Sequence, residues 1–85
     1  MRRDKLEIIR SILIICNIGD ATKTKIVYKV NLNFKTAGVY MKWLIDRELI
    51  TKEGKFFKMT PKGSELLSNL QSASTFLDLN NRFDP

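Results

Sequence analysis

Apolar residues recur every three or four positions over residues 4–17, which predicts an amphipathic helix. One face of this helix carries Leu6, Ile9, Leu13 and Cys16. A second stripe consists of Ile8, Ile12 and Ile15. Gly19 then ends the pattern. Because two stripes exceed what one core face requires, we expect this helix to meet a second partner surface.

Two further helices are predicted in the middle of the chain, with a tight turn between them. Thr22 is a good N-cap for a short helix over residues 23–30. Asn31 tolerates the left-handed conformation that stops a helix, and Asn33 can cap the next one, over residues 34–47. The outward face of this third helix carries Lys35, Thr36, Val39, Lys42, Trp43 and Asp46.

After Leu49 the period becomes that of extended chain, over residues 50–52 and 55–59, which predicts a two-stranded hairpin. Thr60 and Pro61 then form a helix start, with a cap followed by proline at the first helical position. The fold class is therefore mainly α with a small β-hairpin (α+β), in the order helix, helix, helix, hairpin, helix. We expect residues 1–72 to form one domain and residues 73–85 a helix extension with a frayed tail.

The positive charge is concentrated in the middle of the chain. The whole sequence has 15 Lys and Arg against 9 Asp and Glu, a net charge of +6. Residues 23–62 hold ten of the basic residues and three of the acids, while the rest of the chain holds five and six. The positive charge is therefore confined to the second helix, the third helix and the hairpin. This distribution favours a phosphate-binding surface over a lysine face that serves only solubility.

Several function classes are disfavoured by the composition. Histidine is absent and Cys16 is the one cysteine, so neither a His/Cys zinc site nor an internal disulfide can form. With no His base, no Gly-rich phosphate loop and no nucleophile elbow, we expect no catalytic residues, no metal and no cofactor. No apolar run reaches the ~18–20 residues of a membrane span, and we expect a cytoplasmic, nucleoid-associated protein without a small-molecule ligand.

The run VNLNFKTAGVYMKWLIDRELI, residues 30–50, followed by FKMTPKG, residues 57–63, resembles the small archaeal winged helix-turn-helix family of predicted transcriptional regulators. The resemblance covers residues 6–70 and implies binding of double-stranded DNA. The third helix would enter the major groove, and the hairpin, or wing, would reach the backbone phosphates or the minor groove. Gly38 and Glu48 depart from the family pattern, which has a polar residue and a glycine at these places.

The resemblance and the charge pattern together assign candidate roles. The residues expected to face the bases are Asn33, Lys35, Thr36 and Val39. Those expected at phosphates are Lys23, Lys25, Lys29, Lys42, Lys52, Lys55 and Lys58, of which Lys52, Lys55 and Lys58 should cluster near the hairpin tip. A homodimer is expected to form through Ile8, Ile12, Ile15, Leu66, Leu70 and Leu77. Alternatively, the last helix covers the second isoleucine stripe within one chain.

Some residues admit two interpretations. We expect Trp43 to pack against the hairpin rather than stack on a base, Phe57 to be buried and Phe56 exposed. Cys16 is expected to act as a small hydrophobic residue rather than a redox sensor. The DNA-binding regulator has two rivals: a winged-helix module that binds another protein, and a sequence-tolerant architectural protein of the chromosome.

Overall fold

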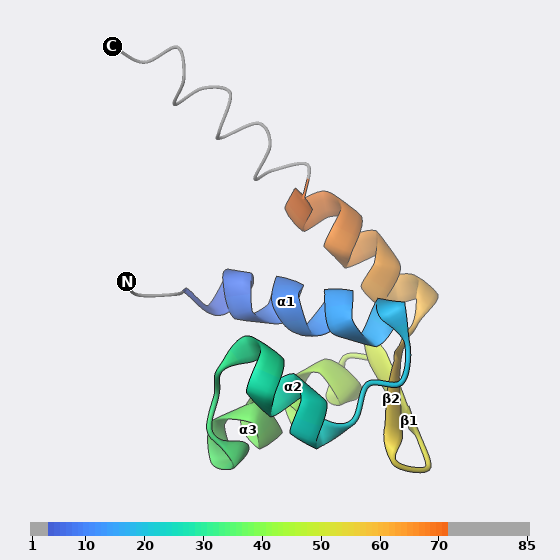
Figure 1. Cartoon of the computed structure of the whole chain (residues 1–85). Helices are drawn as coiled ribbons and strands as arrows, with labels where there is room; N and C mark the ends of the chain where they lie inside the picture. The colour runs from blue at the N-terminus through green and yellow to red at the C-terminus, as the bar shows by residue number, and fades with distance from the viewer. Residues whose placement is uncertain (1–3, 72–85) are drawn as a thin grey trace, which may run out of the picture.

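The computed structural model describes residues 4–71. Within them, α1 (Lys5–Ile18), α2 (Lys23–Val30) and α3 (Phe34–Asp46) precede an antiparallel hairpin of β1 (Ile50–Glu53) and β2 (Phe56–Met59) (Figure 1). A fourth helix follows over residues 61–71. The expected order of elements is confirmed, with bounds within one or two residues of those predicted. The extension and tail expected over residues 73–85 lie outside the described residues.

Side-chain caps set the starts of the first three helices. The Asp4 carboxylate accepts from the Glu7 N–H at 2.8 Å, and the Asn33 side-chain oxygen accepts from the Thr36 N–H at 2.7 Å. Thr22 caps α2 through a bond from the Lys25 N–H at 3.2 Å. Asn31 ends α2 in the left-handed conformation, at a φ of 59°. The tight turn between α2 and α3 is therefore confirmed, and it has the predicted cause.

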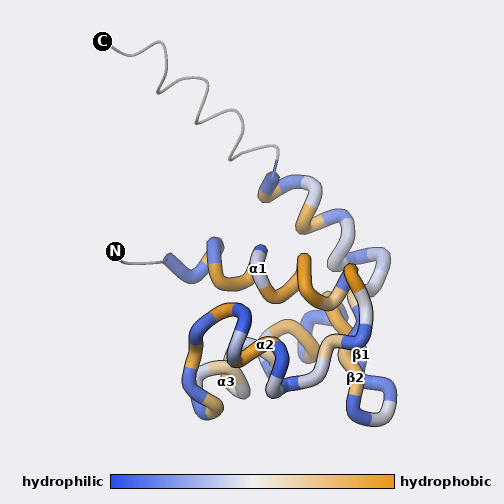
Figure 2. The backbone as a smooth tube through the Cα atoms, viewed as in Figure 1, coloured by the Kyte–Doolittle hydropathy of each residue, from blue (hydrophilic) through white to orange (hydrophobic). Residues whose placement is uncertain are grey.

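The core is built around α1, which runs between the fourth helix and the α2–α3 pair (Figure 1). Ile8 and Ile12 from the second stripe are buried in one cluster with Ile9 and Leu13 from the first. Leu67 of the fourth helix belongs to the same cluster. Figure 2 shows how far apolar residues extend along α1. A helix with neighbours on two sides requires both stripes, so they do not by themselves indicate a partner.

Two expectations about α1 are corrected by this packing. Ile8 and Ile12 were predicted at a dimer interface, but they are 8% and 0% exposed within the single chain. Leu6 was predicted on the core face, but it is 59% exposed. The buried arc of α1 is centred between the two predicted stripes, and Leu6 lies beyond its edge.

The register of the hairpin decides which lysines share a face. Ile50 pairs with Met59 and Lys52 with Phe57, so these four side chains lie on one face, because paired residues point the same way. Lys58 therefore lies on the other face, where it forms an ion pair with Glu53 at 3.2 Å. The expected cluster of Lys52, Lys55 and Lys58 is thus wrong for Lys58.

Hydrogen bonds join the hairpin region to the segment before α2 and to the segment after α3. The Phe57 N–H donates to the Ala21 carbonyl at 2.8 Å, just before α2 begins. On the other side, the Thr60 hydroxyl donates to the Glu48 carbonyl at 2.6 Å and accepts from the Gly63 N–H at 3.0 Å. These bonds hold the wing at a defined place beside α2 and α3.

Candidate nucleic-acid interface

The start of α3 presents a mixed polar and apolar surface. Lys35 is exposed, and Val39, one turn later, is 65% exposed. Thr36 is half-buried. The Asn33 side-chain oxygen is occupied by the cap of α3, which leaves its NH₂ group as a donor. Of the four residues predicted to face bases, Asn33, Lys35 and Val39 are therefore exposed and Thr36 is half-buried.

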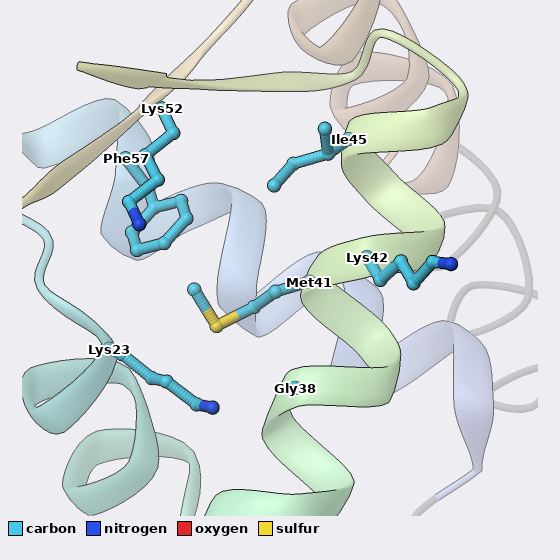
Figure 3. Close-up of a pocket in the computed structure, with 7 residues that line it drawn as sticks. All are labelled: Lys23, Gly38, Met41, Lys42, Ile45, Lys52 and Phe57. Carbon is cyan, nitrogen blue, oxygen red and sulfur yellow. The ribbon is translucent and has the colours of Figure 1, made fainter. Parts of the chain in front are cut away.

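A basic notch lies between the start of α2, the side of α3 and the hairpin (Figure 3). It has a volume of about 270 Å³ and is lined by Lys23, Gly38, Met41, Lys42, Ile45, Lys52 and Phe57. Figure 3 shows the side chains of Lys23 and Lys52 extending toward the notch, whereas the ammonium group of Lys42 points away from it. Three successive parts of the chain, α2, α3 and the hairpin, thus contribute to one hollow with lysines at its rim and an apolar floor.

Aromatic rings lie beneath the lysines of this region. The Lys52 Nζ is 5.8 Å from the ring centroid of Phe57, and the Lys23 Nζ is 5.9 Å from that of Phe34. These distances are within the range of a cation–π attraction. Among residues 4–71, the structure records an ion pair for Lys58 and for neither Lys23 nor Lys52. The two ammonium groups therefore keep their charge available for an anion.

Other predicted phosphate contacts lie elsewhere. Lys25 and Lys29 line a small hollow with Ile15 and Ile18, on the side of α2 that faces the end of α1. Lys55 covers Phe56, at 5.3 Å from the ring centroid. The sequence places all these lysines in one basic segment, but the structure distributes them over several faces.

On the flank of α3 opposite the notch lies an apolar hollow that the sequence did not indicate. It has a volume of about 390 Å³ and is lined by Lys5, Leu6, Ile9, Val39, Tyr40 and Trp43. Trp43 was expected against the hairpin, but here it lies beside α1, because Ile45 takes the hairpin side of α3. The Arg47 guanidinium stacks on the Trp43 ring at 4.0 Å.

The remaining candidates have structural explanations. Cys16 is buried in the core, and this burial raises the pKa of its thiol to about 11, which agrees with the hydrophobic role. Phe57 is buried as expected, whereas Phe56 is half-buried rather than exposed. Among the described residues, no cluster of three His, Cys, Asp or Glu side chains could hold a metal ion. Nor does any helix in this part of the chain have the length and apolar character needed to cross a membrane.

The residues expected at a dimer interface fall into three groups. Ile8 and Ile12 are covered by the chain itself. Ile15, Leu66 and Leu70 are partly buried against the core and keep some exposed surface. Leu77 lies outside the described residues. The surface available to a second copy is therefore smaller than predicted.

Sequence comparisons agree with this architecture. The profile of a family described as winged helix-turn-helix matches residues 2–77. The uncharacterized protein MJ0290 of Methanocaldococcus jannaschii is 39% identical over 71 residues, which cover 84% of this chain and 34% of the relative. A second protein of that organism, MJ0287, is 35% identical over 69 residues, 81% of this chain and 71% of the relative. The chain thus spans about a third of the first relative's length.

Solved structures share the fold at low sequence identity. Sso10a-2, a DNA-binding protein from Sulfolobus solfataricus, superposes with a TM-score of 0.79 at 21% identity, over 94% of this chain and 87% of the other. The activation domain of the phage T4 transcription factor MotA gives 0.68 at 17% identity, over 99% and 87%. Lactococcus lactis ZitR gives 0.67 at 22% identity, over 98% and 66%.

Proposed function

The chain belongs to the winged helix-turn-helix family, and on that premise we propose that it binds double-stranded DNA as a transcriptional regulator. The observation that supports this most directly is the basic notch along the side of α3, together with the exposed Lys35 near the start of that helix. In a helix-turn-helix protein the second helix of the motif lies in the major groove. Likeness to a structure described as a DNA-binding protein adds support for the fold that carries this role.

In this proposal, α3 and the hairpin have different tasks. Lys35 donates to guanine acceptors, and Thr36 and Val39 meet thymine methyl groups, with the Asn33 amide as a further donor. Backbone phosphates are neutralised by Lys23 and Lys52 at the notch, and by Lys42 and Lys55 at a greater distance from it. Lys25, Lys29 and Lys58 become peripheral contacts, because they lie on other faces.

Binding to random and selected duplexes over a range of salt concentrations tests the proposal. Affinity should fall steeply with salt, by a slope of ~0.9 for each phosphate neutralised. Replacing Lys35 and Thr36 together by alanine should reduce sequence preference more than total affinity, whereas Lys52→Ala with Lys55→Ala should weaken all sequences alike. No duplex binding at about 50 mM salt would refute the proposal. Equal affinity for all duplexes would instead identify a sequence-tolerant chromosomal protein.

We further propose that the regulator is a homodimer. Leu66 and Leu70 lie one turn apart on the fourth helix and retain exposed surface, as does Ile15 of α1. A dimer would place two copies of α3 about 34 Å apart and would require a pseudo-palindromic site. Leu70→Asp should convert the dimer to a monomer in sedimentation equilibrium. A wild-type protein that sediments as a monomer at all concentrations would exclude this assembly.

A second candidate function is that of a module that binds another protein. The apolar hollow favours it, because Leu6, Val39 and Trp43 expose hydrophobic surface around one depression. The shared fold also occurs in a domain described as an activation domain. Leu6→Lys changes this hollow without touching the notch, so a partner that requires the hollow would be lost while duplex affinity stays unchanged.

A further inference from the structure

We propose that the basic notch holds one sugar–phosphate unit of the bound duplex, and that Lys23 and Lys52 share its phosphate. This inference rests on the proposed function and adds a specific geometry to it. Instead of two independent lysines, each with its own phosphate, the start of α2 and the wing would act on the same backbone position. On the side of the hairpin, α3 would then be fixed relative to the DNA backbone.

The lining of the notch suits a sugar–phosphate better than a bare anion. Lys23 extends toward it from the start of α2, and Lys52 extends toward it from β1 (Figure 3). The apolar side chains of Met41, Ile45 and Phe57 line the same notch. A phosphate requires cationic donors, and the deoxyribose beside it offers an apolar carbon face. The lysines therefore match the phosphate, while the apolar side chains match the sugar.

Gly38 explains how Lys23 reaches this position. A Cβ at residue 38 would be 3.2 Å from the Lys23 Nζ and 3.9 Å from its Cε, so the lysine side chain lies over the bare backbone of α3. α3 continues as a helix through Gly38. The glycine, a departure from the family pattern, thus opens the side of α3 on which Lys23 rests.

The two lysines are held in place by the backbone around them. Lys23 is two residues after Ala21, whose carbonyl accepts from the Phe57 N–H at 2.8 Å. Phe57 is in turn the strand partner of Lys52. This hydrogen bond and the pairing of β1 with β2 therefore link the backbones that carry both lysines, which lowers the entropy lost when they bind one anion.

The salt dependence of DNA binding distinguishes a shared phosphate from two separate ones, because its slope counts phosphates and not lysines. If Lys23 and Lys52 share one phosphate, Lys23→Ala and Lys52→Ala should each reduce the slope by less than ~0.9, and the double variant by ~0.9 in total. The double variant should then lose about eightfold in affinity at about 0.1 M salt from counterion release alone. Two separate phosphates would give ~0.9 for each variant and ~1.8 for the pair.

The control is Lys62→Ala, which also removes one positive charge from the first turn of a helix after a threonine cap. It should leave both slope and affinity unchanged. A second variant, Gly38→Leu, fills the notch without removing charge, and it should reduce affinity and slope as the double variant does. Urea unfolding of every variant verifies that the fold is retained, and Gly38→Ala gives a smaller steric change if leucine disturbs it.

The outcomes separate this inference from the proposed function. Slopes that add to ~1.8, or a Gly38→Leu variant with wild-type affinity, would overturn the shared phosphate while DNA binding stands. A wild-type protein with no duplex affinity would overturn both. Inorganic phosphate, titrated in the absence of DNA, should shift the Gly38 amide resonance only at high concentration. Saturation at micromolar phosphate would assign the notch to a free phosphorylated ligand instead.

Discussion

Replacing Gly63 with alanine is expected to destabilise the fold, because the start of the fourth helix presses against the end of the α3–β1 connection at this residue. Gly63 is buried. A Cβ there would overlap the Leu49 carbonyl oxygen and would also approach the Met59 Cγ to 2.9 Å. The overlapped atom belongs to the backbone, which cannot rotate away as a side chain can.

The cost can be worked out from the contacts that must move. Overpacking of this kind costs about 1–3 kcal/mol. Displacing Leu49 also weakens the bond from the Thr60 N–H to its carbonyl, now 3.1 Å, which is worth about 1 kcal/mol. The better helix propensity of alanine returns about 1 kcal/mol. We therefore expect a net loss of about 1–3 kcal/mol, or roughly 5–20 °C in Tm for a domain of this size.

Gly38→Ala is the matched control, since it makes the same substitution in another helix. Its Cβ would meet only the flexible end of Lys23, so the propensity gain of about 0.5–1 kcal/mol should prevail and Tm should rise. Thermal unfolding followed by circular dichroism, at two protein concentrations to detect any contribution from association, measures both variants. A Gly63→Ala protein that melts within about 2 °C of wild type would refute the proposed backbone clash.

Three further predictions concern single residues. Glu48 adopts a φ of 60°, which costs a residue with a Cβ about 1 kcal/mol, so Glu48→Gly should raise the melting temperature. An unchanged melting temperature would show that the backbone of Glu48 is not strained. Thr60→Val removes both the cap of the fourth helix and the bond to the Glu48 carbonyl, so the free energy of unfolding measured in urea should fall by about 1–2 kcal/mol. Thr60→Ser keeps both bonds and should lower it by less. Burial raises the pKa of Cys16 to about 11, so the thiol stays protonated near pH 8.5. Iodoacetamide should then label the native protein far more slowly than the urea-unfolded protein. Equal labelling rates would show that the thiol is accessible in the native protein.

The helices and the turn were predictable because local chemistry determines them. Thr22, Asn31 and Asn33 act at the places where their side chains or backbone preferences indicated, since a cap satisfies amides only a few residues away. The hairpin was predictable from its change of period. For α1, the two apolar stripes were identified correctly, but the placement of Ile8 and Ile12 at a dimer interface was wrong, because both are buried within the single chain. Two stripes indicate two neighbours, and composition cannot tell whether the second neighbour belongs to the same chain.

The candidate site was less predictable than the fold. The basic segment was identified from charge alone, but the face on which each lysine lies depends on the strand register and on contacts between distant segments. Lys52 and Lys58 are six residues apart, yet the turn between them places them on opposite faces of the hairpin. In the sequence, Gly38 is only a departure from the family pattern. Its relation to Lys23 exists only once α2 packs across α3, so no local pattern could have revealed it.

The two hollows beside α3 provide a physical basis for separating the candidate functions. Gly38, Met41 and Ile45 line the notch, whereas Val39, Tyr40 and Trp43 line the apolar hollow, so the two surfaces occupy opposite flanks of one helix. The duplex backbone would be held on the notch flank, because Lys23 and Lys52 are available there to neutralise phosphates. A protein partner would gain most from burying Leu6 and Trp43 on the other flank. Variants that lie on one flank alone, such as Lys52→Ala or Leu6→Lys, should therefore leave the function of the other intact. Val39 is the exception, because it lines the hollow and is also proposed to meet the bases, so a Val39 variant should affect both functions.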